Sequence, residues 1–173
     1  MSDSSPSMER IWAPWRIEYV RDDSKEDGCF LCRACEEDSD RENLVLWRTE
    51  HSLCILNRYP YNNGHILVAP RAHVPDISDV SEEELMDQMR CIRRCKDDLT
   101  RAVEPDGFNV GLNLGRAAGA GLTTHMHWHI VPRWDGDSNF MLTSAGTKVI
   151  PESLFELWDL LQQVDGEETE PET

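Results

Sequence analysis

The feature that most constrains this chain is a run in which histidine alternates with large apolar residues, His125-Met126-His127-Trp128-His129-Ile130-Val131. Strict alternation is the two-residue period of a strand that buries one face. Met126, Trp128 and Ile130 are therefore expected to face a core, while the three imidazoles share the opposite face. A single histidine on a strand is usually an ordinary polar residue, but three in this pattern indicate a surface that carries out chemistry.

One alternative is a metal ion held by all three histidines. Four strand steps of about 3.3 Å place His125 and His129 about 13 Å apart along the backbone. Imidazole nitrogens bind a metal at about 2.1 Å, so these two rings cannot share one ion on an unbent strand. At most two of the three histidines can therefore bind the same metal.

Length and charge narrow the class of protein. The 173 residues are enough for one hydrophobic core and too few for two. The chain has 17 Lys and Arg against 33 Asp and Glu, a net charge of −16, which argues against nucleic acid or anionic membranes as partners. Neither a membrane-spanning apolar run nor a signal-peptide pattern is present, so we expect a cytoplasmic protein.

Hydrophobic periodicity predicts an α+β fold: an antiparallel meander sheet with one long helix on its face and a short C-terminal helix. Ser81 and Glu84 form a capping box at the start of the long helix, whose methionines are expected in the core and which Pro105 ends. One domain is expected over residues 9–163, with disordered tails at 1–8 and 164–173. Strands are predicted over 44–48, 52–57, 65–69, 108–114 and 125–131, and the second helix over 151–163.

Six cysteines in a chain expected to lie in a reducing compartment favour metal ligands or buried thiols over disulfides. Cys29 and Cys32 have the spacing of a metal-binding knuckle. Cys54 lies in a predicted strand and Cys95 on the apolar stripe of the helix, so both are predicted to be small core residues. Cys91 precedes Cys95 by one turn and has no separate explanation.

Several separated motifs accompany the histidine run. The Gly-rich stretch Asn113–Gly121 leads into it, and Gly64–His73 (GHILVAPRAH) lies upstream. Together with Trp12–Arg16 (WAPWR) and Gly107–Gly115 (GFNVGLNLG), these motifs resemble the histidine-triad (HIT) family in order and spacing. The resemblance is to the branch that contains bacterial diadenosine-tetraphosphate phosphorylases, and it covers roughly residues 9–160.

The resemblance implies a HIT fold, a homodimer and an enzyme of nucleotidyl transfer. His127 would attack the α-phosphorus of a nucleotide, and water or inorganic phosphate would resolve the nucleotidyl-histidine. A backbone carbonyl that the sequence does not identify would hold the other nitrogen of His127. His129 would donate to a phosphate oxygen or the leaving group, and His65 would complete the cluster.

The implied substrate is a dinucleoside polyphosphate such as diadenosine tetraphosphate, which would carry Mg²⁺. Two alternatives remain open: a hydrolase of nucleoside phosphoramidates, and a nucleotide-binding regulator with little turnover. All three predict nucleotide binding, but only the two enzymes predict a covalent intermediate on His127.

The resemblance also implies substrate contacts. Asn57 matches the ribose contact of the family and Asn113 its amide on the phosphate side. Missing side chains let backbone N–H groups of a Gly-rich loop approach phosphate oxygens. The chain departs from the family at one of these loop positions, where relatives often carry Ser or Thr. Either a nearby threonine supplies that hydroxyl, or water is a better acceptor than phosphate. The expected loop contacts are Gly119, Ala120, Gly121 (the departing position) and Thr123, with Thr124 as the other threonine.

Finally, the resemblance implies a structural zinc site made by Cys29, Cys32, His73 and His125. Two thiolates and two imidazoles form a closed tetrahedral site without a vacancy for catalysis. Cys35 and His51 are rival ligands that the sequence does not exclude.

Overall fold

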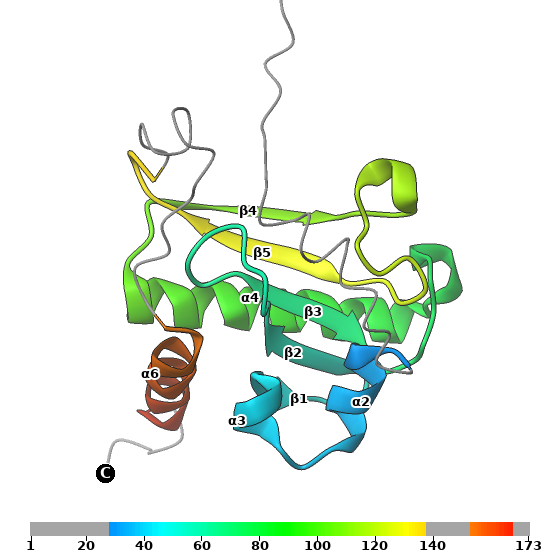
Figure 1. Cartoon of the computed structure of the whole chain (residues 1–173), viewed down its shortest axis with the longest axis horizontal. Coiled ribbons are helices and arrows are strands. Elements are labelled where there is room, and N and C mark those ends of the chain that lie inside the picture. Colours follow the sequence, from blue (N-terminus) through cyan, green and yellow to red (C-terminus); the bar gives the residue numbers. More distant parts are fainter. Residues whose placement is uncertain (1–27, 138–152, 168–173) are drawn as a thin grey trace, which may run out of the picture.

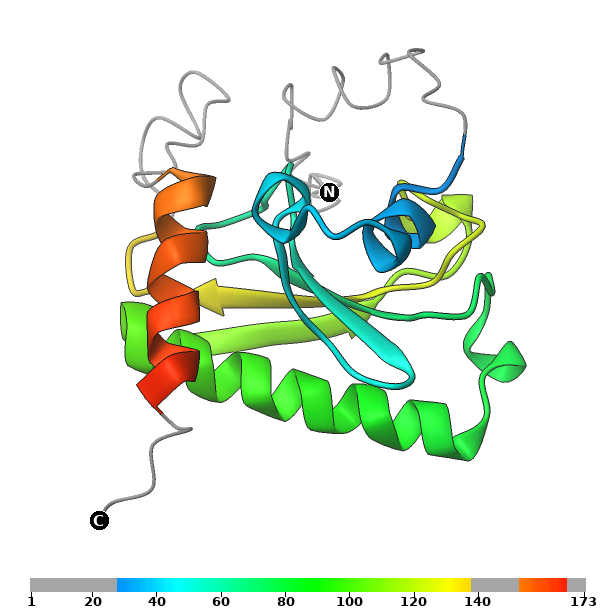
Figure 2. The ribbon, with the colours of Figure 1, turned by 90° about the horizontal axis from the view of Figure 1, so that it is seen from below.

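The computed structural model describes residues 28–137 and 153–167. Five antiparallel strands form one open sheet in the order β1-β2-β3-β5-β4. Helix α4 covers one face of this sheet, and α2 and α3 lie on the other side (Figures 1 and 2). The strands are β1 (Val45–Arg48), β2 (Ser52–Leu56), β3 (Ile66–Pro70), β4 (Gly107–Leu112) and β5 (Trp128–Arg133). The helices are α2 (Phe30–Glu36), α3 (Asp40–Asn43), α4 (Glu82–Val103) and α6 (Leu154–Glu167), with short 3-10 turns η1 (Ile77–Asp79) and η2 (Arg116–Ala118).

The predicted α+β fold is confirmed, and the strand order adds a feature that the sequence did not predict. Strands β1, β2 and β3 form the expected meander, because each pairs with its neighbour in the chain. After α4, strand β4 forms the edge of the sheet and β5 inserts between β3 and β4. The strand that carries the last histidine of the run is therefore paired on both sides.

The strand predicted over 125–131 was wrong at its start, because β5 begins at Trp128. Met126 donates its N–H to the carbonyl of Val74 at 2.8 Å, not to a neighbouring strand. The first two histidines of the run therefore precede the strand, and only His129 lies within it.

The side chains of the run alternate between the two faces, as predicted. Met126 and Ile130 are buried. The indole of Trp128 donates to the side chain of Gln88 on α4 at 2.8 Å, so Trp128 points to the helix-covered face. His129, one residue further along the same strand, therefore projects from the opposite face.

Helix α4 begins with the predicted capping box. The Ser81 hydroxyl accepts from the N–H of Glu84, and the Glu84 carboxylate accepts from the N–H of Ser81 at 2.9 Å. The helix ends at Val103, and Glu104 follows it in the left-handed conformation, with φ of 44°.

The buried side of α4 differs from the prediction. Met86 and Met89 are 54% and 36% exposed, so the expectation that the methionines of this helix are core residues was wrong. Cysteine and glutamine occupy much of the buried side of the helix instead. The buried residues of the helix are Gln88, Cys91, Cys95, Asp98 and Leu99.

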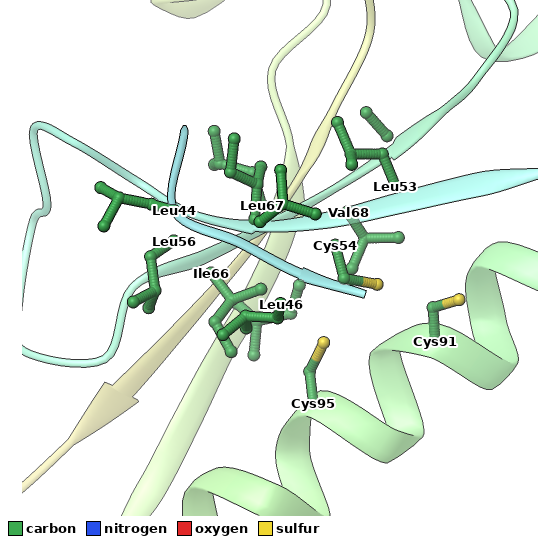
Figure 3. Packing of buried hydrophobic residues seen from close by; sticks show 14 of the residues in the cluster. Leu44, Leu46, Leu53, Cys54, Leu56, Ile66, Leu67, Val68, Cys91 and Cys95 are labelled. Atoms are coloured by element: carbon green, nitrogen blue, oxygen red, sulfur yellow. The ribbon is translucent and has the colours of Figure 1, made fainter. Parts of the chain in front are cut away.

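The core between α4 and the sheet contains three cysteine thiols. Cys54 of β2 faces Cys91 and Cys95 of α4 (Figure 3). All three are at most 3% exposed, which confirms the prediction for Cys54 and Cys95 and gives Cys91 the same place.

The turn before β3 requires glycine. Gly64 has φ of 72°, and a Cβ there would lie 2.9 Å from Cδ2 of Leu99 and 2.9 Å from Cγ of Pro132. The turn that leads to His65 therefore packs closely against Leu99 of α4 and Pro132 of β5.

The single domain over residues 9–163 and the disordered tails remain predictions. Residues 9–27, including Trp12–Arg16, lie outside the described residues, so a single domain over 9–163 is untested. Helix α6 starts after position 151 and continues past position 163, to Glu167. Among the described residues, none of the helices is both long and apolar enough to cross a lipid bilayer.

Candidate active site and metal site

His125 connects two clusters of side chains. It is fully buried, and its Nε2 donates to the carbonyl of Pro70 at 2.8 Å. A neutral imidazole carries one proton, so Nδ1 is left bare. That nitrogen lies 3.2 Å from Sγ of Cys29 and 3.5 Å from Sγ of Cys32, which is the orientation that a metal ligand needs.

The four predicted metal ligands come together. The ligand atoms of Cys29, Cys32, His73 and His125 all lie within 4.8 Å of one another. Cys29 precedes α2 and Cys32 lies in its first turn, so the two thiols share one side of the helix. Two sulfurs and two imidazole nitrogens are a donor set that fits zinc in a closed site.

The two rival ligands are not members of this group. Cys35 is not part of the four-residue group, and Nε2 of His51 lies 3.8 Å from a carboxylate oxygen of Glu83. Within the cluster, burial and the neighbouring Cys29 raise the pKa of Cys32 to about 11. A cation would therefore have to displace the thiol proton in order to bind.

The ring of His127 is held by a hydrogen bond to His125, the residue that connects the two clusters. Its Nδ1 donates to the carbonyl of His125 at 3.0 Å, which identifies the backbone acceptor that the sequence left open. Nε2 is therefore bare. Burial lowers the pKa of His127, and the bond to the carbonyl offsets only part of that effect. The arrangement presents a neutral imidazole with one free nitrogen, as a nucleophile requires.

His129 and His65 complete the cluster. Nδ1 of His129 lies 2.9 Å from Nε2 of His65, and Nε2 of His129 lies 3.3 Å from the amide Nδ2 of Asn113. The rings of His127 and His129 meet edge to face with centroids 5.0 Å apart. The sequence prediction thus placed these four side chains in one group, although they come from three separate segments.

Sequence reasoning missed Tyr61, because nothing in the turn that contains it suggested chemistry. Its ring lies against His65 and His129, with centroid distances of 4.7 and 5.6 Å. Its backbone N–H donates to Nδ1 of His65 at 3.1 Å. A contact through the main chain cannot be recognised from residue type.

The predicted substrate residues are placed less uniformly. Oδ1 of Asn57 accepts from the N–H of Tyr59, and its Nδ2 lies 3.2 Å from Nδ1 of His65, so the amide is engaged with the histidine cluster. In the Gly-rich loop, the N–H groups of Gly119 and Ala120 donate to the carbonyls of Arg116 and Gly115. A phosphate would have to compete for these two donors. Gly121 is exposed and Thr123 is half-buried.

Comparison with known proteins decides the family. A family model described as the HIT domain matches residues 39–136. This chain belongs to the HIT family.

Relatives of this HIT protein include enzymes. A protein of Mycobacterium tuberculosis named AP-4-A phosphorylase is 36% identical over 154 residues, which cover 85% of this chain and 79% of that protein. The asymmetrical bis(5'-nucleosyl)-tetraphosphatase of Schizosaccharomyces pombe is 32% identical over 93 residues, 54% of this chain and 50% of that protein. The solved structure of a Zn-bound histidine triad family protein from Mycobacterium smegmatis matches with a TM-score of 0.66 and 26% identity, covering 81% of this chain and 94% of that one.

Because His65 is held neutral in the folded state, the stability of this HIT protein depends on pH. Burial, with smaller effects of His129 and His127, lowers the pKa of His65 from 6.5 to about 2. The unfolded chain therefore binds a proton that the folded chain does not, and stability falls as pH drops below about 6.5. From about pH 7 to about pH 5 this one group costs about 2 kcal/mol.

We therefore expect urea denaturation of the wild-type protein to show a larger loss of unfolding free energy between these two pH values than His65→Gln shows. The difference between the two losses should be about 2 kcal/mol. Equal losses would show that His65 is not held neutral.

Proposed function

We propose that this chain is an enzyme that cleaves dinucleoside polyphosphates by nucleotidyl transfer through His127. One observation carries the proposal: the Nδ1–H of His127 is donated to the His125 carbonyl, which leaves Nε2 bare inside a cluster of histidines. The likeness to a protein named AP-4-A phosphorylase supports the class of substrate.

The proposed reaction has two steps. Nε2 of His127 attacks the α-phosphorus, and the bond from that phosphorus to the bridging oxygen breaks, releasing a nucleotide. An oxygen of inorganic phosphate or of water then attacks the same phosphorus and releases His127. With diadenosine tetraphosphate, phosphate gives ADP and ATP, whereas water gives AMP and ATP.

The remaining site residues would bind and orient the substrate. His129 would donate from Nε2 to the leaving oxygen, and His65 would hold the ring of His129 in place. Mg²⁺ would accompany the polyphosphate and offset its charge. The proposed substrate contacts are Asn57, Asn113, Gly119, Ala120, Gly121 and Thr123.

The test is incubation with diadenosine tetraphosphate and magnesium, with and without inorganic phosphate, and separation of the nucleotides formed. We expect cleavage at the α-phosphorus, and an activity at least about a thousandfold lower for His127→Ala because no nucleophile remains. The matched control is His51→Ala, which removes a histidine that lies beside Glu83. Equal activity of His127→Ala and the control would refute the proposal.

We further propose that the cluster of Cys29, Cys32, His73 and His125 binds zinc as a structural ion. Zinc would tie α2 to the segment that precedes β5 and would hold His125, whose carbonyl binds His127. The Zn-bound relative supports this choice of metal.

Cobalt substitution tests the metal site, because tetrahedral cobalt bound by thiolates absorbs visible light. We expect Cys32→Ser to weaken the thiolate-to-cobalt absorption and to lower metal affinity at least about tenfold. Binding in the wild-type protein should weaken as pH falls, since protons compete for the thiols. Cys35→Ser is the matched control and should leave the spectrum unchanged; loss of the spectrum in that variant instead would contradict the ligand set.

The chain is also proposed to form a homodimer. Three apolar side chains on α4 and the edge strand β4 support it: Met86, Met89 and Val110 are 54%, 36% and 48% exposed. An edge strand with unpaired backbone groups can pair with a second copy. A cytoplasmic location and the lack of nucleic acid or membrane partners follow from composition and remain predictions.

A further inference from the structure

We propose that Asn57 and the main-chain N–H of Tyr61 are positioning groups that place the ring protons of His65 and His129 on Nε2. His129 then meets the substrate as a neutral hydrogen-bond donor. The effect of these proton positions on catalysis rests on the proposed function, but the proton positions themselves do not.

The orientation of the Asn57 amide is the first step. Its Oδ1 accepts from the backbone N–H of Tyr59 at 3.0 Å, and a backbone N–H can only donate. The oxygen is therefore committed to Tyr59. The other end of the amide, Nδ2, must face Nδ1 of His65, 3.2 Å away.

A second donor reaches the same nitrogen. The backbone N–H of Tyr61 donates to Nδ1 of His65 at 3.1 Å. Two donors that converge on one ring nitrogen require that nitrogen to be bare. His65 is 1% exposed and stays neutral, so its single proton lies on Nε2.

The proton position of His65 in turn determines that of His129. Nε2 of His65 lies 2.9 Å from Nδ1 of His129, and two N–H groups cannot face each other in a hydrogen bond. Nδ1 of His129 is therefore the acceptor, and the proton of His129 lies on Nε2. In the absence of substrate, Asn113 next to that nitrogen would accept it through Oδ1, with its amide turned over.

The two neighbouring histidines thus have opposite proton positions. His127 carries its proton on Nδ1 and offers a bare Nε2, while His129 offers a protonated Nε2. The ring of Tyr61 packs against the rings of both His65 and His129. One ring is set to attack the phosphorus and the other to stabilise an oxygen.

This arrangement selects a class of leaving group. A neutral imidazole that donates from Nε2 can stabilise negative charge on a departing phosphate oxygen without losing its proton. An amine leaving group has to take up a proton as its bond to phosphorus breaks, and a neutral imidazole is a poor source of it. The site therefore favours polyphosphates over phosphoramidates.

Nuclear magnetic resonance of full-length protein with ¹⁵N-labelled histidine measures the proton positions directly, because bare and protonated ring nitrogens have different shifts. Signals are assigned with single His→Gln variants. We expect a protonated Nε2 and bare Nδ1 for His65 and His129, and the reverse for His127. A proton on Nδ1 of His65 or His129 in the wild-type protein would overturn the inference, whether or not the protein is active.

Asn57→Asp replaces a donor with an acceptor of the same shape. We expect Nδ1 of His65 to become protonated in this variant, because a hydrogen bond to a carboxylate is stronger than the neutral bond from the Tyr61 N–H that it would displace. Asn109→Asp is the matched control: Oδ1 of Asn109 accepts from Nη1 of Arg133 at 2.8 Å, and a carboxylate preserves that contact. The control should keep the wild-type pattern, and an unchanged pattern in Asn57→Asp would overturn the role of Asn57.

Activity gives the second readout. The ratio of kcat/KM for diadenosine tetraphosphate to kcat/KM for adenosine 5'-phosphoramidate should fall at least about tenfold in Asn57→Asp and stay constant in Asn109→Asp. Both substrates carry the same adenosine 5'-phosphoryl group, so a lost ribose contact cancels from the ratio. A constant ratio would overturn the selection of leaving groups. A protein with the expected proton positions that cleaves neither substrate would instead contradict the proposed function alone.

Discussion

The site depends on one hydrogen bond, from Nδ1 of His127 to the carbonyl of His125. A buried bond of this kind contributes about 1 kcal/mol net, but a donor buried without a partner costs about 1–3 kcal/mol. The bond therefore fixes which nitrogen of His127 is bare. The carbonyl stays in place because the ring of His125 is held by Pro70 on one side and faces two thiols on the other. His125, one of the four proposed metal ligands, and His127, the proposed nucleophile, are thus two residues apart in one short segment.

The fold brings the other groups to this segment by constraints that lie outside it. Strand β5 is paired on both sides, which fixes His129 opposite Leu67 of β3 and Gly111 of β4. Gly64, which precedes His65, lies so close to Leu99 of α4 that a Cβ there would be 2.9 Å from Cδ2 of Leu99. Helix α4 occupies the opposite face, where Gln88 binds Trp128. The helix stabilises the sheet while its side chains leave the histidine face to the substrate.

The sequence predicted the fold class, the capping box and the residues of both clusters apart from Tyr61, because periodicity and residue type carry that information. It did not predict that β5 starts at Trp128, since Met126 leaves the ladder to bond Val74, a partner distant in the chain. The core side of α4 was predicted only in part. Cys91 is buried there near the thiol of Cys54, and Gln88 is buried where it accepts from the indole of Trp128. Met86 and Met89 face outward instead. Main-chain partners, such as the N–H of Tyr61, leave no trace in residue type.

The central claim is that the reaction passes through a covalent bond to His127, and its stereochemical course tests this most directly. Diadenosine tetraphosphate made chiral at the α-phosphorus with oxygen isotopes is cleaved, and the configuration of the nucleotide product is determined. Attack by His127 followed by attack of the acceptor inverts the phosphorus twice, so the account predicts net retention. Net inversion would mean that water or phosphate attacks the substrate directly, and it would contradict the account.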